Sequence, residues 1–381
     1  MLKICVYAIC KNEIKFVDKW LDNVSEADYI VVLDTGSTDG TYEKLKADKR
    51  VTVVKQKEIK PWRFDVARNE SMKLIPKDTD ICVCTDFDEL FTPGWARAVR
   101  DNWKKDTNRM FYTYAWGQTP DGFWHDIFRG DKIHGPKGFK WIYPIHEILY
   151  SDDPQNVVDF GQTLYLYHHQ DTSKPRKYYL DLLKLGAEEN PNDPHIRVLY
   201  AREFIIEGNV TPENIKKAIE EYVEVLKLPN IEEECYNLEK LHALIQLALI
   251  FFVYDHEYEK ALKCCLKFLE YDQTYRDPYL VMAGIFNAEG LYVLAEACLN
   301  AAKEYTYQHY TWIERQNTFL DWMPSIEYDT KYHLGKFDEA LDAVGRALEF
   351  CPDSLEYLKN QNIILRACLD AKNKKEEKEA E

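Results

Sequence analysis

Residues 29–41, YIVVLDTGSTDGT, decide the fold, because an apolar strand pattern runs directly into a loop of turn-forming residues. Apolar residues then recur at Tyr42 and Leu45, as expected of a helix that packs on a sheet. A polar side chain from residues 37–39 is placed to cap the start of that helix. The stretch therefore predicts a strand, a tight loop and a helix in succession.

The residues on either side repeat this alternation. Residues 3–10, KICVYAIC, form an apolar strand pattern that leads through Lys11 into an amphipathic helix ending near Val24. Residues 51–54 supply a third short strand. The order βαβαβ predicts an α/β domain with a mostly parallel sheet, and such sheets bind ligands at the carboxyl ends of their strands.

A later strand pattern ends in a cluster of acidic residues. Residues 81–90 read ICVCTDFDEL, so Asp86 and Asp88 follow an apolar run directly. Because side chains alternate along a strand, both carboxylates are predicted to emerge on the same side. Two hard oxygen ligands suffice for Mg²⁺ or Mn²⁺ when phosphate oxygens and water complete the coordination sphere. The pattern predicts a divalent metal site that holds a diphosphate.

Five short signatures occur along the first half of the chain. They are residues 11–13 (KNE), 33–41 (LDTGSTDGT), 64–69 (FDVARN), 86–89 (DFDE) and 145–147 (IHE). In this order and spacing they resemble the family 2 inverting glycosyltransferases of the GT-A fold, in the bacterial branch that carries tetratricopeptide repeats. The resemblance covers residue 3 to about residue 190. It implies a Rossmann-like GT-A domain, expected at residues 1–172, that uses a nucleotide-diphosphate sugar.

The resemblance also implies roles for donor-binding residues. Asp34 corresponds to the carboxylate that accepts from the imide N–H of the base, and Arg68 to the residue that faces the base or the pyrophosphate. Asp86 corresponds to the ribose contact, while Asn12 and Glu13 belong to the donor-binding loop. The alternative for Asp34 is a turn-stabilising role, and for Arg68 a surface ion pair. A UDP-sugar is the expected donor.

Metal ligands follow from the same resemblance. Asp88 corresponds to the direct ligand of Mn²⁺ or Mg²⁺, and Asp86 also approaches the metal. The family often adds a downstream His, and here a strand pattern ends in His168 and His169. Both cannot face one site in an extended chain. His168 is favoured, with His169 as the alternative.

An inverting transfer needs a general base that takes the acceptor's proton. Glu147, in the IHE signature, is the first candidate, because its aromatic neighbours in the sequence could raise its pKa. Asp126 is the second candidate and Glu89 the third. The chain lacks the Gln-x-x-Arg-Trp motif of processive relatives, so polymer synthesis is not expected.

Composition narrows the class of protein further. The chain has 381 residues and a formal net charge of −16, which disfavours a nucleic-acid surface. Ten cysteines without a secretory signal or paired zinc spacing indicate free thiols in a reducing compartment. No apolar run has the length of a membrane span. A cytoplasmic protein without a membrane span is expected.

The second half has a helical pattern with a repeat. Ala261 and Ala295 occupy equivalent places in similar segments 34 residues apart, the tetratricopeptide period. The next equivalent, Ala340, comes 45 residues later and implies an insertion near residues 305–321. An all-α tetratricopeptide-like solenoid is therefore expected over residues 173–371, followed by a frayed charged tail at residues 372–381.

The solenoid suggests the acceptor. A concave helical surface suits a peptide, and relatives with such repeats include enzymes that glycosylate bacteriocin peptides, so a peptide or protein acceptor is the first interpretation. A glycan or lipid-linked acceptor is the alternative. The solenoid could instead form a homodimer or buttress the catalytic domain. A different class of function is a non-catalytic tetratricopeptide adaptor with a degenerate transferase domain.

Overall fold

The computed structural model describes residues 1–118, 124–160, 163–171, 178–206, 208–306, 309, 311 and 320–380. Its contacts divide the chain into two compact units, Met1–Pro191 and Asn192–Glu381. The division falls later in the chain than residue 172, the domain end expected from the sequence. The helix before the division pairs with the first unit, where Arg63 Nη1 lies 2.6 Å from Glu189 Oε1.

Strands and helices alternate through the first half of the first unit, and strands dominate its second half. In chain order the elements are β1 (Ile4–Cys10), α1 (Val17–Val24), β2 (Tyr29–Asp34), α2 (Thr41–Ala47), β3 (Val53–Gln56), α3 (Phe64–Met72), β4 (Ile81–Cys84), β5 (Glu89–Phe91), α4 (Trp95–Asn102), β6 (Arg109–Gln118), β7 (Trp124–His134), β8 (Lys140–Ile142), β9 (Ile148–Tyr150), β10 (Val157–Asp159), β11 (Tyr165–His168) and α5 (Tyr179–Glu189).

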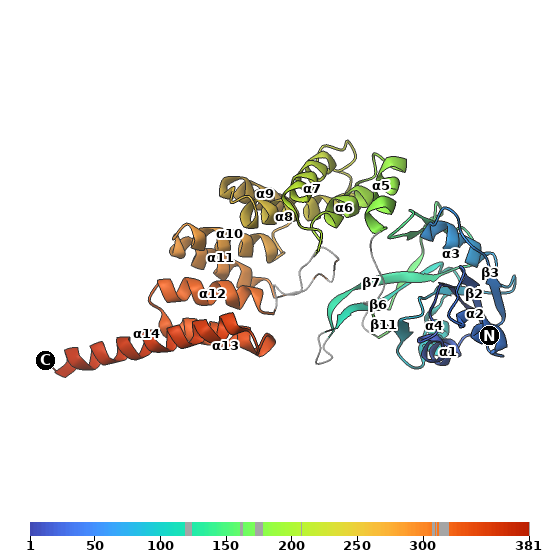
Figure 1. Ribbon diagram of the computed structural model, residues 1–381, viewed down its shortest axis with the longest axis horizontal. Coiled ribbons are helices and arrows are strands. Elements are labelled where there is room, and N and C mark those ends of the chain that lie inside the picture. The colour runs from blue at the N-terminus through green and yellow to red at the C-terminus, as the bar shows by residue number, and fades with distance from the viewer. Residues whose placement is uncertain are drawn as a thin grey trace. The chain divides into compact units, whose positions relative to one another are not determined.

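One mixed sheet organises this unit (Figure 1). Its strands lie in the order β3-β2-β1-β4-β7-β6-β11-β5, with β10 paired to β6. The pairs among β3, β2, β1 and β4 are parallel, as the βαβαβ pattern predicted. The pairs of β7 with β4 and β6 are antiparallel, which the sequence did not predict.

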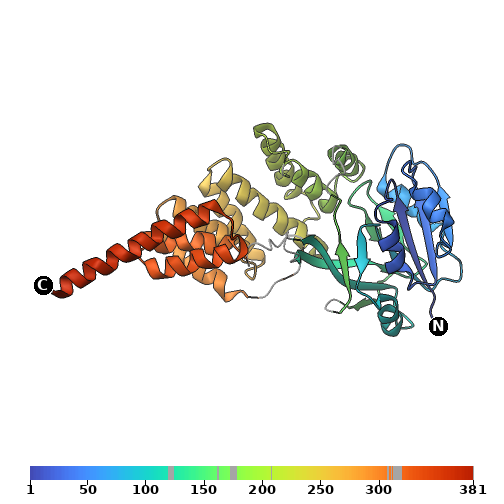
Figure 2. The same cartoon turned by 60° about the horizontal axis from the view of Figure 1, so that its bottom comes forward.

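The central strand explains why the sheet is covered on both faces. All seven residues of β1 are buried. Ile4, Val6 and Ala8 pack in one core with α1 and α4, while Cys5 and Tyr7 pack in the other with Trp141. Figure 2 shows helices on both sides of these blue strands. A strand buried on both faces reads as a continuous apolar run, as residues 3–10 do.

The second unit is helical throughout its described residues. Its elements are α6 (Pro194–Glu203), α7 (Pro212–Val225), the 3₁₀ turn η1 (Glu234–Tyr236), α8 (Asn237–Val253), α9 (Tyr258–Tyr271), α10 (Asp277–Ala288), α11 (Tyr292–Glu304), α12 (Trp322–His333), α13 (Phe337–Phe350) and α14 (Leu355–Ala380). Figure 1 shows α8 to α13 stacked as successive neighbours.

Small residues explain the close packing of this stack. Ala261, Ala295 and Ala340, the repeat positions identified in the sequence, are all 0% exposed, on α9, α11 and α13. A methyl group at these positions lets neighbouring helices approach closely, so the repeat reflects a repeated packing requirement.

Two sequence expectations concern the later part of this unit. The insertion expected near residues 305–321 falls between α11 and α12, and most of it lies outside the described residues. The tail expected to fray from residue 372 is included in α14, which continues to Ala380. The described side chains of residues 371–376 are exposed, as the charged composition predicts.

One described helix, Glu234–Val253, is long and apolar enough to cross a membrane, with a mean hydropathy of 1.2. No apolar run of membrane-spanning length was expected from the sequence. Two-thirds of its apolar window (67%) is buried inside the protein, where Leu241, Ile245 and Ala248 belong to a core cluster. A core helix of a soluble domain has the same composition, so this helix is weak evidence for a membrane span.

Candidate active site

The predicted site residues converge on the carboxyl edge of the parallel strands. Asp34 ends β2 beside Cys10 at the end of β1, and the turn containing Asp86 and Asp88 follows β4. The strand itself ends at Cys84, so the acidic pair lies in a turn and strand alternation does not direct its side chains. The predicted location is therefore right, although the reason given for the carboxylates' direction is wrong.

Asp34 is fully buried and bonded within its own turn. Its Oδ1 accepts hydrogen bonds from the backbone N–H groups of Gly36 and Ser37, each at 2.9 Å, and from Gln56 Nε2 at 3.0 Å. Burial alone would raise the pKa of Asp34, but the bonds from Ser37, Gln56 and Gly36 hold it below its usual value. This geometry favours the turn-stabilising alternative. Contact with a nucleotide base stays a prediction.

Asn12 and Glu13 tie the loop after β1 to the loop after β2. The Asn12 side-chain oxygen accepts from the Thr38 N–H at 2.8 Å, and the Glu13 N–H donates to Thr41 Oγ1 at 2.9 Å. Asp39 accepts from the Thr41 N–H at 3.0 Å, while the N-cap residue of α2 is Gly40, with φ of 94°. Among the expected capping residues, Asp39 therefore binds the first turn without being the N-cap.

Arg68 is the buried centre of the site. Its Nη2 lies 2.9 and 3.0 Å from the two Asp86 carboxylate oxygens, and its Nε donates to Glu147 Oε1 at 2.5 Å. The guanidinium also lies over the Trp141 ring, 5.2 Å from its centroid. With 4% exposure, Arg68 is not the surface ion pair that was the alternative. One cation from α3 thus holds two carboxylates in place.

Lys132, on β7, is a second cation that the sequence analysis missed. Its Nζ lies 3.1 Å from Glu89 Oε1 and 3.6 Å from Asp86 Oδ2. Although burial alone would raise the pKa of Asp86, Arg68 and Lys132 hold it well below its usual range. The sequence around Lys132 does not reveal which carboxylates it will contact.

Asp88 has a different partner. His168 Nε2, at the end of β11, lies 3.4 Å from Asp88 Oδ2. Burial would lower the pKa of His168, but the hydrogen bond and charge of Asp88 raise it. The following residue, His169, donates its backbone N–H to the Asp88 carbonyl at 2.7 Å, while its imidazole lines a pocket together with Lys15 and Lys19. His168, rather than His169, is therefore the imidazole beside the Asp88 carboxylate.

The donor set fits a divalent cation through two protein ligands. Among the described residues, Asp88 pairs with no cationic side chain other than His168. The buried Nδ1 of His168 has no hydrogen-bond partner among those residues. Asp86, by contrast, is bound to Arg68 and Lys132. No group of three or more His, Cys, Asp or Glu side chains is arranged for a metal within the described part of the chain. Diphosphate oxygens and water would have to complete the shell.

The three candidate bases differ in their surroundings. Glu147 pairs with Arg68, where the sequence analysis had considered only aromatic neighbours. Glu89 is 1% exposed and accepts from Tyr114 Oη, Lys132 Nζ and the Asp86 N–H, so it has a structural role in this turn. Asp126 lies on β7 opposite Gly117, and its side chain is outside the described part of the structure.

Comparison with known proteins finds similarity to both units. Residues 5–173 match the family model "Glycosyl transferase family 2". Among solved structures, Staphylococcus aureus TarS is similar with 13% identity and a TM-score of 0.43, over 68% of this chain and 54% of that one. A tetratricopeptide protein of Thermus thermophilus, TTC0263, is similar with 19% identity and a TM-score of 0.36, over 50% of this chain and 90% of that one. No curated protein sequence matches.

Proposed function

We propose that this chain, a glycosyltransferase with its family 2 domain at residues 5–173, is metal-dependent and inverting and transfers a sugar from a UDP-sugar to a peptide or protein. The observation that carries the proposal is the pairing of Asp88 with His168 at the carboxyl edge of the sheet, at 3.4 Å. The alternatives are a glycan or lipid-linked acceptor and a non-catalytic adaptor. The family match and the complete acidic cluster favour an enzyme over the adaptor.

The charges of the site support a metal. Asp86, Glu89 and Glu147 already form ion pairs with Arg68 and Lys132, so these two cations are engaged before a donor arrives. A departing diphosphate therefore needs further positive charge. A divalent cation held by Asp88 and His168 would supply it as a Lewis acid when bound.

The position of Asp34 supports the proposal of a UDP-sugar donor. Its Oδ1 accepts three hydrogen bonds, and Oδ2 lies 3.4 Å from the weak donor Cys10 Sγ. The Ser37 side chain also bonds to this carboxylate. Oδ2 thus retains acceptor capacity for the imide N–H of a uracil ring. Asn12 and Glu13 contribute by fixing the adjacent loop.

Transfer requires removal of a proton from the acceptor. We assign this step to Glu147: its carboxylate takes the proton from the acceptor hydroxyl or thiol, the acceptor atom attacks the anomeric carbon, and the bond from that carbon to the diphosphate breaks. Attack on the face opposite the leaving group inverts the anomeric centre. Arg68 orients Glu147 through the 2.5 Å contact. Asp126 is the second candidate for this role.

The helical unit supports a peptide or protein acceptor. Stacked repeats with small residues at helix crossings produce extended binding surfaces in this class of fold. The ten cysteines are all free, as expected of a protein in a reducing compartment, and we propose a cytoplasmic location. A homodimer through the helical unit is the other role open to that surface.

Donor specificity and metal dependence can be tested together. We expect the full chain to release UDP slowly from one UDP-sugar in the presence of Mn²⁺ or Mg²⁺, and to lose that release with EDTA. The panel should include UDP-, GDP- and dTDP-sugars, with Asp88→Ala as the inactive control. If the enzyme does not hydrolyse its donor, the binding of UDP measured by calorimetry tests the nucleotide preference instead. Release that is unaffected by EDTA, or selective for another nucleotide, would contradict the proposal.

A further inference from the structure

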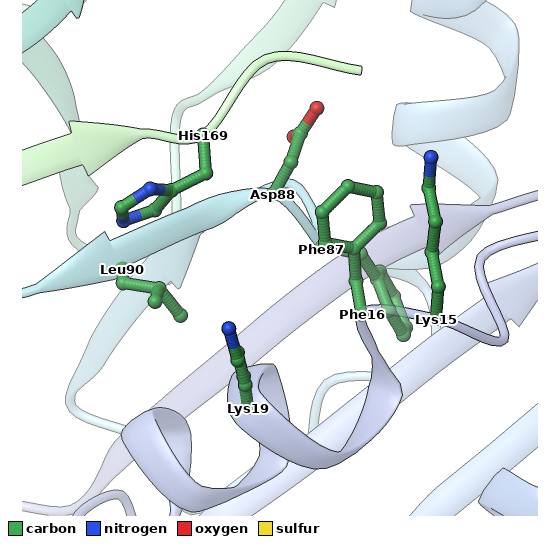
Figure 3. Close-up of a pocket in the computed structure, with 7 residues that line it drawn as sticks. All are labelled: Lys15, Phe16, Lys19, Phe87, Asp88, Leu90 and His169. Atoms are coloured by element: carbon green, nitrogen blue, oxygen red, sulfur yellow. The ribbon is translucent and has the colours of Figure 1, made fainter. Parts of the chain in front are cut away.

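A pocket lies beside Asp88, on the side of the turn that faces α1. It has a volume of about 180 Å³ and is lined by Lys15, Phe16, Lys19, Phe87, Asp88, Leu90 and His169. Figure 3 shows the three apolar side chains among two ammonium groups and one imidazole. Asp88 is the one lining residue with a role assigned above, and its carboxylate pairs with His168.

Its floor is rigid. Phe87 is 2% exposed and stacks on Trp20 of α1, with ring centroids 4.2 Å apart and planes at 14°. The His169 N–H binds the Asp88 carbonyl at 2.7 Å, which fixes the wall formed by the end of β11. The pocket therefore exists before any ligand binds.

Two lysines line the pocket together with Asp88, although the chain as a whole has a net charge of −16. Lys15 Nζ pairs with Asp171 Oδ1 at 2.8 Å. Lys19, four residues later, makes no ion pair or side-chain hydrogen bond within the described residues, and its Nζ extends toward the cavity in Figure 3. The Asp88 carboxylate points away from Lys19 and interacts with His168. An anion at Lys19 is thus favoured.

We propose that this pocket binds an acidic side chain of the acceptor, so that the enzyme selects a peptide with a glutamate-like residue near the modified one. The proposal rests on the proposed function and specifies its acceptor. The aliphatic stem of a glutamate would pack on Phe16, Phe87 and Leu90, while its carboxylate would reach Lys19. Its position next to Asp88 places such a residue beside the transfer site.

The lining favours this ligand over a sugar or a polyol phosphate. Those ligands carry several hydroxyl groups, and each hydroxyl needs a hydrogen-bond partner when it leaves water. The apolar wall of Phe16, Phe87 and Leu90 offers none. Lys15 is already paired with Asp171 and Asp88 with His168, so Lys19 and His169 are the polar lining side chains that remain. A carboxylate on an aliphatic stem needs polar partners at one end only.

The pocket can be tested without a nucleotide sugar, so the result does not depend on transfer. The probes are N-acetylglutamate N-methylamide and its isostere N-acetylglutamine N-methylamide, with binding to the full chain measured by saturation-transfer NMR. We expect the glutamate probe to bind, the glutamine probe to bind at least about threefold more weakly, and Lys19→Met to remove the difference. Lys46→Met, an exposed lysine on α2, is the matched control and should bind as the unaltered chain does.

Equal binding of the two probes, or a preference retained in Lys19→Met, overturns the proposal. Lys19-dependent binding of inorganic phosphate without binding of the glutamate probe also overturns it, and assigns the pocket to a phosphate-bearing acceptor. Release of UDP from the donor is measured separately in the same variants. Glutamate binding with no UDP release from any donor shows that the proposed function has failed while the pocket's ligand preference stands.

Discussion

Two turns at the same edge of the sheet use carboxylates in opposite ways. Asp34, after β2, is surrounded by neutral donors: two backbone amides, an amide side chain and a thiol. Asp86, after β4, is bound by the cations Arg68 and Lys132. Both carboxyl pKa values lie below the usual range, by hydrogen bonds in one case and by charge in the other. The first turn holds the loop, while the second prepares a charged site.

The largest expected effect is that of Asp88, the carboxylate that pairs with neither Arg68 nor Lys132. Asp88→Ala should reduce transfer by about 10⁴-fold or more, because the several kcal/mol of charge stabilisation from a metal would be lost. The fold should persist, since Asp88 lies in a turn. The measurement is product formation with the identified UDP-sugar, with circular dichroism as the folding control. Activity near that of the unaltered enzyme would remove the metal site from the mechanism.

Substitution of Glu147 tests whether the charged site contains a general base as well as ion pairs. Glu147→Gln should leave donor affinity unchanged and slow the chemical step by about 10²–10⁴-fold, the usual contribution of a general base. Single-turnover kinetics and donor Kd should be measured in the same variant. A parallel fall in donor affinity would instead show that Glu147 positions Arg68, to which it is bonded.

Substitution of Asp34 tests the role of the turn after β2, where the carboxylate has neutral partners. Asp34→Ala removes the acceptor of three hydrogen bonds from Gly36, Ser37 and Gln56, and should lower the free energy of unfolding by about 1–3 kcal/mol. Urea unfolding followed by tryptophan fluorescence measures this loss. Donor Kd in the same variant should also rise if Oδ2 contacts the base. Donor affinity that stays constant would leave Asp34 with the structural role alone.

A pH-dependent effect concerns His134, another buried titratable group with neutral partners. Its Nε2 lies 2.8 Å from Tyr7 Oη, its Nδ1 lies 2.7 Å from the Gly135 carbonyl oxygen, and burial lowers its pKa to about 4. Below the unfolded pKa of about 6.5, the unfolded chain takes up a proton that the folded chain does not. Stability should therefore fall by about 2 kcal/mol between pH 7 and pH 5.

His134→Gln keeps an amide that can bond to Tyr7 and removes the titration. Between pH 7 and pH 5, the free energy of unfolding of this variant should fall by about 2 kcal/mol less than that of the unaltered chain. Urea unfolding at pH 7 and pH 5 provides the comparison. An identical loss in both proteins would assign the acid sensitivity to other groups.

The sequence by itself determined the parallel half of the sheet. Residues 3–10 and 29–34 are apolar enough to be buried on both faces, and a strand followed by turn formers and an amphipathic helix admits few other arrangements. It also determined the packing of Ala261 and Ala295 in the helical unit, because the need for a small side chain recurs with each helix pair. Both are local patterns, so they can be recognised from the sequence alone.

Only the tertiary structure decided the partners of each charge. Lys132 is 46 residues from Asp86 in the chain, and antiparallel pairing of β7 with β4 brings them together. Arg68 likewise reaches Glu147 across 79 residues, which changes the setting of the candidate base from aromatic to cationic. The distinction between His168 and His169 depends on the pairing of β11 with β5. Coulombic interactions act over a few ångströms in space regardless of sequence distance, so the site's electrostatics appear only after the strands are paired.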